Sequence, residues 1–163
     1  MSTSYQHTVF LNLPVASLAD SIAFYTALGF VQNHNFSSPA AAQMSLPSTP
    51  TSPTSGPEAH TGVFKLMLLT HDFYRTFLPP GHSIPDPKKV AQQILCISRE
   101  SREAVDEFLK AVEENGGKRD VRPESEMDRV MKAQGFYGGN AMDPDGHLIE
   151  CVFMPSEMYA GKE

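Results

Sequence analysis

The sequence contains no tryptophan, only two cysteines among 163 residues, and no excess of basic side chains. The 13 Lys and Arg residues face 19 Asp and Glu residues, and the net charge of -6 disfavours a nucleic-acid partner, because phosphate binding requires a basic surface. No run of 18 or more apolar residues occurs, so we expect no membrane-spanning segment. The first ten residues lack a basic region followed by an apolar one, which predicts a cytoplasmic rather than a secreted protein.

The two cysteines, Cys96 and Cys151, both lie in strand-like runs. We expect them to be buried free thiols, as is typical of proteins in a reducing compartment. Apolar residues make up 40% of the chain, which is enough for one ordinary domain with a hydrophobic core.

A strand followed by a helix is predicted near the N-terminus. Residues 8–15 (TVFLNLPV) form an apolar run typical of a strand, and residues 17–30 have apolar side chains at helical spacing. Ser17 is the expected N-cap of this helix, and Gly29 is the residue expected just past its last turn.

The same strand-helix pattern recurs 84 residues later. Residues 92–99 predict a strand, and a helix capped by Ser101 follows and ends at the glycine pair 116–117. Further strand-like runs come after each unit, which indicates two βαβββ modules and an α+β fold. The predicted parts of this single domain, 1–163, are module 1 at about 7–70, a connecting helix at 71–78 and module 2 at about 91–154.

One segment of the first module has an unusual composition. Residues 47–62 contain four prolines and seven Ser or Thr residues. Since few apolar side chains are present to offset the entropy of ordering, we interpret the segment as a flexible insertion between two strands. A phosphorylation site and a lid are the alternatives.

Several stretches carry a resemblance to a known superfamily. LPVASLADSIAFYTALGF, the 84-residue repeat and DPDGHLIE together resemble the vicinal oxygen chelate superfamily, which contains glyoxalase I, bleomycin-resistance proteins and extradiol dioxygenases. FKLMLLTHDFYRTF, SRESREAVDEF and FYGGNAMDPDGHLIECVFM are similar to its lactoylglutathione lyase-like branch. The likeness extends over nearly the whole chain outside residues 47–62. It implies the glyoxalase/bleomycin-resistance fold, in which two βαβββ modules form mixed sheets that curl around a cleft.

The resemblance also implies where a metal ion would bind. Metal-using members carry four ligands, on the first and last strands of each module. These positions match Phe10, Ile94, Glu150 and a residue near Leu68, where the match allows a slip of one residue. Of these, only Glu150 has a ligand-capable side chain, whereas Zn, Ni, Fe or Mn ions bind three or four N, O or S donors. We therefore expect no metal and no other cofactor, with a divalent metal ion as the disfavoured alternative.

Strand alternation predicts which other side chains face the cleft. We expect a mostly apolar site with a few polar groups, which suits a small organic ligand. The candidate ligand-binding residues are Phe10, Asn12, Leu68, Thr70, Ile94, Cys96, Tyr137, Asn140, Met142 and Val152.

Glu150 is the candidate catalytic residue. A carboxylate that loses hydration in apolar surroundings is a better proton acceptor, and the resemblance places the working carboxylate of the family here. As a base, Glu150 would act in a lyase or isomerase step in which Asn12 or Asn140 stabilises an oxyanion. The alternative is that Glu150 accepts a hydrogen bond from Asn12 or a backbone amide and stabilises the sheet.

Three functions stay open at this point. The first is a metal-independent glyoxalase-like lyase or isomerase, and the second is a binding or resistance protein that needs a pocket but no base. The third is metal-dependent lactoylglutathione lyase activity, for which the chain lacks both ligands and a basic cluster. Branch relatives often have Arg where this chain has Gly139, which removes one anchor for an anionic ligand. A small molecule is the expected partner, and by analogy with the family we expect a homodimer.

Overall fold

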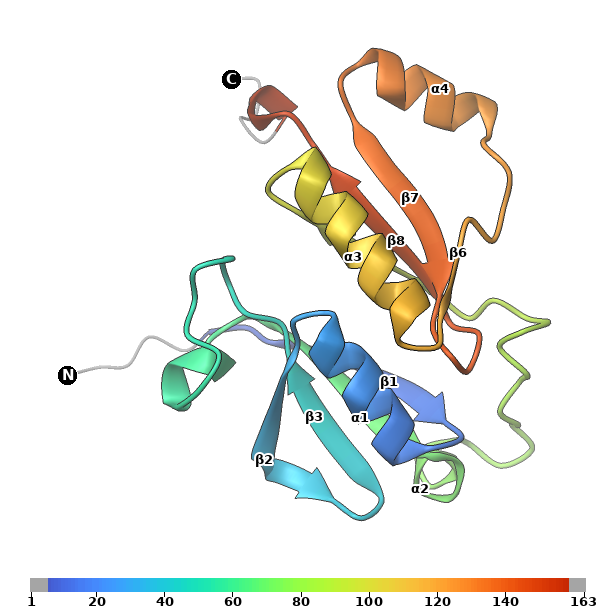
Figure 1. Cartoon of the computed structure of the whole chain (residues 1–163). Coiled ribbons are helices and arrows are strands. Elements are labelled where there is room, and N and C mark those ends of the chain that lie inside the picture. The colour runs from blue at the N-terminus through green and yellow to red at the C-terminus, as the bar shows by residue number, and fades with distance from the viewer. Residues whose placement is uncertain (1–5, 159–163) are drawn as a thin grey trace. The chain divides into compact units, whose positions relative to one another are not determined.

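The chain folds into two modules of similar construction (Figure 1). The computed structural model describes residues 6–158. The chain divides between Pro85 and Asp86 into two compact units, here called the N-terminal and C-terminal modules. Each contains a four-stranded mixed sheet, which confirms the predicted α+β class. Over residues 6–158, no helix is long and apolar enough to cross a membrane.

The sheet of the N-terminal module has the strand order β1-β4-β3-β2. Strand β1 is parallel to β4, and the other neighbouring strands are antiparallel. The elements are β1 (Val9–Val15), α1 (Leu18–Ala27), β2 (Val31–Ser38), β3 (Ala41–Ser45), the short 3-10 helix η1 (Pro57–His60), β4 (Phe64–Thr70) and α2 (His71–Arg75).

The sheet of the C-terminal module repeats this arrangement with the order β5-β8-β7-β6. Strands β5 and β8 are parallel, and the others pair antiparallel. The module differs from its N-terminal counterpart by an additional helix, α4, between β6 and β7. The elements are β5 (Ile94–Ser98), α3 (Arg102–Glu114), β6 (Lys118–Arg119), α4 (Glu126–Ala133), β7 (Tyr137–Met142), β8 (Leu148–Phe153) and the 3-10 helix η2 (Ser156–Met158).

Helices α1 and α3 begin where the sequence predicts. The Ser17 side chain accepts a hydrogen bond from the Asp20 amide at 3.3 Å, and the Ser101 side chain accepts one from the Ala104 amide at 3.1 Å. Gly29 follows α1 with φ of 92°, a left-handed conformation that glycine adopts without steric cost. The predicted caps and the glycine stop of α1 are therefore confirmed.

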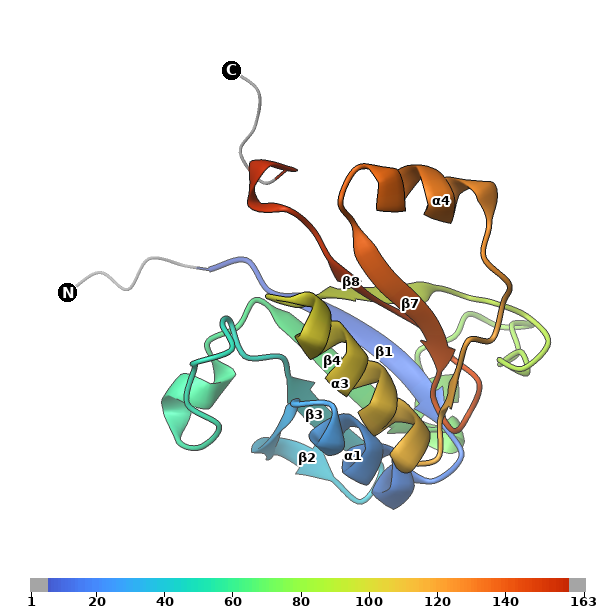
Figure 2. The same cartoon turned by 45° about the horizontal axis from the view of Figure 1, so that its top comes forward.

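In each module the long helix packs on one face of the sheet, and this face holds the hydrophobic core (Figures 1 and 2). In the N-terminal module, Phe24 of α1 and Leu68 of β4 are both almost fully buried. In the C-terminal module, Phe108 of α3 and Ile149 of β8 are buried in the same way. The other face of each sheet is covered less evenly.

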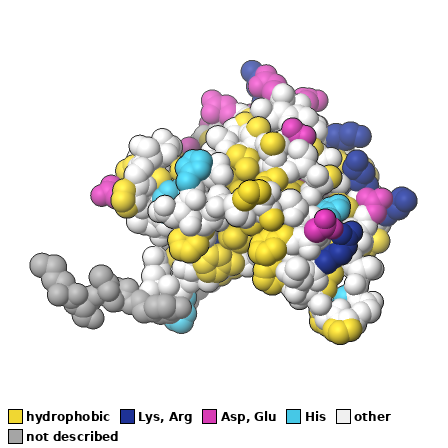
Figure 3. All heavy atoms as spheres, turned by 90° about the horizontal axis from the view of Figure 1, so that it is seen from below, with side chains coloured by type: hydrophobic (Ala, Val, Ile, Leu, Met, Phe, Trp, Pro, Cys, Tyr) yellow, Lys and Arg dark blue, Asp and Glu magenta, His cyan; other side chains and the backbone are white. Residues whose placement is uncertain are grey.

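Apolar side chains remain exposed on these other faces. Phe10 of β1 and Ile94 of β5, which the 84-residue repeat makes equivalent, are each 56% exposed. Hydrophobic side chains also reach the surface on the face of the molecule shown in Figure 3. The cleft predicted between the two modules stays a prediction.

Two segments differ from the sequence prediction. The insertion, residues 47–62, connects β3 and β4 as expected, but it ends in η1, where Ala59 is fully buried. Burial of the Ala59 side chain anchors the insertion, which the composition of residues 47–62 did not predict. The connecting helix α2 ends at Arg75, three residues before the predicted end of 71–78.

Candidate ligand-binding site

A cavity of about 420 Å³ lies within the C-terminal module, over the face of the sheet that α3 does not cover. Strands β7 and β8 form its floor through Gly138, Asn140 and Glu150, whose register places them on one face. Helix α4 and the segment that precedes it form a wall. Drug-sized ligands commonly occupy cavities of this volume.

Helix α4 is held in place by a capping box at its N-terminus. The amide of Asp128 donates to Ser125 Oγ at 3.1 Å, and the amide of Ser125 donates to Asp128 Oδ2 at 2.6 Å. This helix was not predicted from the sequence. The Ser125-x-x-Asp128 spacing, followed by apolar residues at helical intervals, is the signal that predicts it.

The apolar part of the cavity comes from α4, the following turn and β8. Met127 and Met131 lie four residues apart on α4, and Phe136 and Val152 complete the apolar lining. Methionine side chains adapt their shape to a ligand at little energetic cost. A Cβ at Gly138 would lie 2.9 Å from Val152 Cγ1, so the absence of a side chain there keeps the floor of the cavity open.

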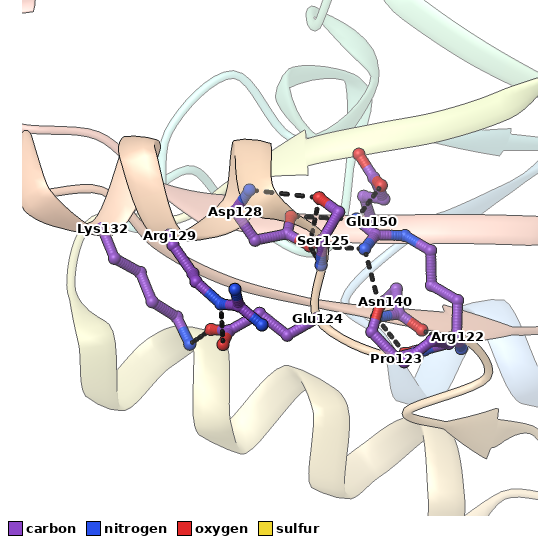
Figure 4. Close-up of polar contacts among 9 residues, drawn as sticks. All are labelled: Arg122, Pro123, Glu124, Ser125, Asp128, Arg129, Lys132, Asn140 and Glu150. Atoms are coloured by element: carbon purple, nitrogen blue, oxygen red, sulfur yellow. Dashed lines mark hydrogen bonds and ion pairs between the residues drawn. The ribbon is translucent and has the colours of Figure 1, made fainter.

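The polar part of the cavity is centred on Arg122 (Figure 4). Its guanidinium donates to both carboxylate oxygens of Asp128, at 2.6 and 3.0 Å, and to Oε1 of Glu150 at 3.2 Å. The hydrogen bonds to Asp128 and Glu150 raise the pKa of Arg122 above its usual range. The hydrogen bond from Arg122, followed by those from Ser125, holds the pKa of Asp128 well below its usual range. Arg122 therefore links the loop before α4 to both the helix and the floor strand β8.

Asn140 fixes the backbone of Arg122. The Arg122 amide donates to Asn140 Oδ1 at 2.9 Å, and Asn140 Nδ2 donates to the Arg122 carbonyl at 3.4 Å. Asn140 thereby positions Arg122, and its predicted role in stabilising an oxyanion stays a prediction.

Glu124 and Lys132 add a second group of charges to the lining of the cavity. Glu124 accepts hydrogen bonds from Lys132 and, at 3.4 Å, from Arg129 Nε (Figure 4). The hydrogen bond from Lys132, its charge and the contact with Arg129 lower the pKa of Glu124. These ion pairs are exposed, and each contributes little to stability on its own.

The prediction that Glu150 is a solitary carboxylate among apolar neighbours is wrong. Its side chain is 30% exposed and pairs with Arg122, a residue 28 positions earlier in the chain. The partner is also neither Asn12 nor a backbone amide, the donors considered from the sequence. The site thus presents a carboxylate and a guanidinium side by side.

The C-terminal sheet brings most of its predicted site residues to one face. Strand register aligns Cys96, Glu150 and Asn140, as predicted from alternation. The same register places Ile94, Met142 and Val152 on that face. Of the predicted site residues, Tyr137, Asn140, Glu150 and Val152 line the cavity.

The two cysteines differ in exposure. Cys151 faces α3 and is buried, as predicted, and burial raises the pKa of its thiol to about 12. Cys96 lies on the opposite face and is exposed, so the prediction that it is buried is wrong. Partial desolvation, with the charge of Glu150, raises the pKa of the Cys96 thiol. Cys96 is exposed because side chains alternate along β5, so that Cys96 and the buried Ile97 point to opposite faces.

In the N-terminal module the prediction for β4 is wrong by one residue. Phe10 and Asn12 share a face, but Leu68 pairs with Leu13 and Thr70 pairs with Val15 on the face that packs on α1. A slip of one position moves every side chain of a strand to the other face. Met67, which pairs with Asn12, occupies the position on the Phe10 face.

Tyr137 lies on the face of the C-terminal sheet that α3 covers. Its hydroxyl donates to Asp106 Oδ1 at 2.7 Å, and its ring lies 5.6 Å from the Arg102 guanidinium carbon. The hydrogen bond to Asp106, with burial, raises the pKa of Tyr137. The hydroxyl is thus engaged with α3 rather than directed into the ligand face. Gly139 faces the same helix, and a Cβ there would lie 2.5 Å from Leu109 Cδ1.

The residues at the four positions where metal-using members of the vicinal oxygen chelate superfamily carry ligands do not fit a divalent ion. With the corrected register they are Phe10, Met67, Ile94 and Glu150, and only the last offers an oxygen. Within residues 6–158, no three His, Cys, Asp or Glu side chains come together as a metal site.

Comparison with known proteins identifies the family. The model of the Glyoxalase/Bleomycin resistance protein/Dioxygenase superfamily matches residues 5–151, so the chain belongs to this superfamily. The sequence finds no match among curated proteins.

Several solved structures have the same fold. A glyoxalase-related enzyme from Fulvimarina pelagi matches with a TM-score of 0.66 at 18% identity, covering 93% of this chain and 90% of its own. A hypothetical protein from S. aureus matches with a TM-score of 0.64 at 22% identity, covering 93% and 96%. A family enzyme from Burkholderia phytofirmans PsJN matches with a TM-score of 0.61 at 14% identity, covering 92% and 100%. At these identities the likeness establishes the fold alone.

Proposed function

We propose that this chain binds a small, largely apolar organic molecule in the cavity beside α4, without a metal ion. The observation that supports this proposal is the division of one cavity into two parts. Met127, Met131 and Phe136 offer an adaptable apolar wall, while the Arg122–Glu150 pair offers a polar contact on the floor. A ligand with an apolar body and one hydrogen-bonding group fits such a site.

The ion pair favours binding over catalysis by Glu150. The Arg122 guanidinium already occupies Oε1 of Glu150 at 3.2 Å, an oxygen that a general base would have to present to the proton of a substrate. Arg122 is in turn held by Asp128 and by the Asn140 side chain, so it is not readily withdrawn. Proton transfer to Glu150 in a lyase or isomerase step is the second candidate function, and metal-dependent lactoylglutathione lyase activity is the third.

Methionine methyl resonances provide a direct test of the cavity. We expect neutral probes, indole and benzyl alcohol, to cause saturable shifts in the 13C-methyl signals of Met127 and Met131 in the whole chain. Met44, which is fully buried in the N-terminal sheet, is the internal control and should not move. Saturable binding without shifts at the two α4 methionines, or no binding by either probe, would contradict the proposal.

The Glu150→Gln variant separates binding from catalysis. Glutamine keeps the shape of the side chain and can still accept a hydrogen bond from Arg122. We expect indole affinity to change by less than about threefold, because an uncharged ligand gains little from the carboxylate charge. For any substrate found to be turned over, loss of turnover with retained binding would favour the base role instead.

Metal independence is tested separately. We expect protein purified without chelators to hold no stoichiometric transition metal, and EDTA to leave indole binding unchanged. A stoichiometric metal together with EDTA-sensitive activity on the methylglyoxal–glutathione adduct would favour the lactoylglutathione lyase alternative.

A further inference from the structure

A second cavity, of about 520 Å³, lies within the N-terminal module beside the insertion. The end of α1, the start of β2 and the insertion surround it. Among the described residues that line it there is no carboxylate and no Lys or Arg. Its hydrogen-bonding side chains are those of Thr26, Gln32, His34, Thr54, Ser55 and His60.

His60 is held in a defined orientation. Its Nδ1 lies 3.0 Å from Ser45 Oγ, and Lys65 Nζ donates to the same Oγ at 3.2 Å. Because Lys65 supplies a proton to that oxygen, the hydroxyl hydrogen of Ser45 is available for Nδ1 of the imidazole. When the Ser45 hydroxyl donates to Nδ1, the neutral imidazole carries its hydrogen on Nε2, and the imidazolium carries one on both nitrogens. His60 thereby offers an N–H donor from a ring that lines the cavity.

Lys65 places a positive charge close to this imidazole. Its residue is only 7% exposed, and its ammonium donates to Ser45 Oγ and to the His60 carbonyl. Across residues 6–158, no Asp or Glu side chain forms a salt bridge with it. A buried charge without a counter-charge is energetically unfavourable, and a bound anion would offset that cost.

We propose that this cavity binds the anionic oxygen group, phosphoryl or carboxylate, of a small molecule. The Nε2–H of His60 and the imidazole of His34 would donate to the anion, and the charge of Lys65 would attract it. The hydroxyls of Thr54 and Ser55 belong to the insertion, so a bound anion would also connect the insertion to the rest of the module. In this arrangement, Ser and Thr side chains of residues 47–62 have a role in binding the anion.

Binding should tighten as the pH falls. Burial, then Lys65 of β4 and His34 of β2, lower the pKa of His60 in the free protein. An anion at Nε2 favours the imidazolium and therefore opposes these effects. We expect phosphate to bind more tightly at pH 6 than at pH 8, although phosphate itself carries less charge at pH 6.

The test is a titration of the whole chain with inorganic phosphate, followed by histidine side-chain NMR at constant ionic strength. We expect saturable shifts at His34 and His60, with none at His71 and His82 of the same module. Sodium acetate in place of phosphate distinguishes carboxylate from phosphoryl recognition, and potassium chloride at equal ionic strength is the blank. Shifts that do not saturate, that spread over all four histidines or that chloride reproduces would overturn the proposal.

Two variants and a matched control sharpen the result. Lys65→Met, which keeps the length of the side chain, should weaken phosphate binding roughly tenfold, and His60→Leu should weaken it by at least that factor, as expected for loss of charge-assisted contacts. His82→Leu changes an exposed histidine outside the cavity and should leave binding unchanged. Wild-type phosphate affinity in Lys65→Met would contradict the role of the Lys65 charge. The comparison of phosphate with chloride uses the wild-type chain, so it still tests the proposal if a variant fails to fold.

Discussion

The two modules share a topology, but they differ in the side chains on the sheet face that the long helix does not cover. The helix-covered faces are alike, with Phe24 and Phe108 at equivalent positions of α1 and α3. On the other faces, strand register pairs Asn12 with Met67 in the N-terminal module and Cys96 with Glu150 in the C-terminal module. The difference indicates that the helix face maintains the fold, whereas the other face is free to acquire a site.

The contents of these other faces diverge further. In the N-terminal module, the side chain of Asn33 donates to Gln43 Oε1 at 3.0 Å, and Lys65 reaches Ser45, so buried polar groups satisfy one another. In the C-terminal module, α4 lies beside the face and encloses a cavity that contains the Arg122–Glu150 pair. The added helix, absent at the corresponding point of the other module, produces the site.

The largest expected effect tests whether the helix faces are energetically equivalent. Phe24→Ala and Phe108→Ala each remove a buried aromatic side chain, and each should lower the free energy of unfolding of its module by roughly 3–5 kcal/mol. Urea unfolding followed by hydrogen exchange in each module measures the two losses. Phe77→Ala, at a residue 58% exposed, is the control and should change stability by less than about 0.5 kcal/mol. A loss confined to one of the two core variants would break the equivalence.

Local patterns in the sequence predicted most of the fold. The caps at Ser17 and Ser101 and the 84-residue repeat specify the two strand-helix units, because these signals act between residues close in sequence. Alternation also placed Cys96, Asn140 and Glu150 on one face.

The site itself could be predicted only in part. The Arg122–Glu150 pair joins residues 28 positions apart, and neither spacing nor alternation indicates that a loop residue will reach a strand. The register of β4 was ambiguous because KLMLLT is apolar at most positions, so alternation cannot distinguish Met67 from Leu68. Composition of the insertion gave no signal for the burial of Ala59 or the anchoring of His60.

An intermediate effect tests whether α4 is what distinguishes the C-terminal module. Ser125→Ala removes the capping hydrogen bond to the Asp128 amide and should destabilise α4 by about 1 kcal/mol. Amide hydrogen exchange should accelerate roughly fivefold in α4, with little change in the core strands. Ser17→Ala, the matched cap of α1, should leave α4 exchange unchanged. If Ser125→Ala accelerated exchange equally in β7, β8 and α4, the helix would not be a locally stable addition to the sheet.

The smallest expected effect concerns acid, and it applies to the N-terminal module alone. Burial, Lys65 and His34 lower the pKa of His60 below 6.5, so the unfolded chain binds a proton more readily than the folded one. The contribution of neutral His60 is therefore fully present above pH 6.5 and is lost as the pH falls through its lower folded-state pKa. Between pH 7.5 and 5.5, the urea midpoint reported by N-terminal amides should fall more in the wild type than in His60→Gln. The control His82→Gln should keep the wild-type slope, and identical slopes in all three proteins would mean that His60 does not couple the insertion to the stability of this module.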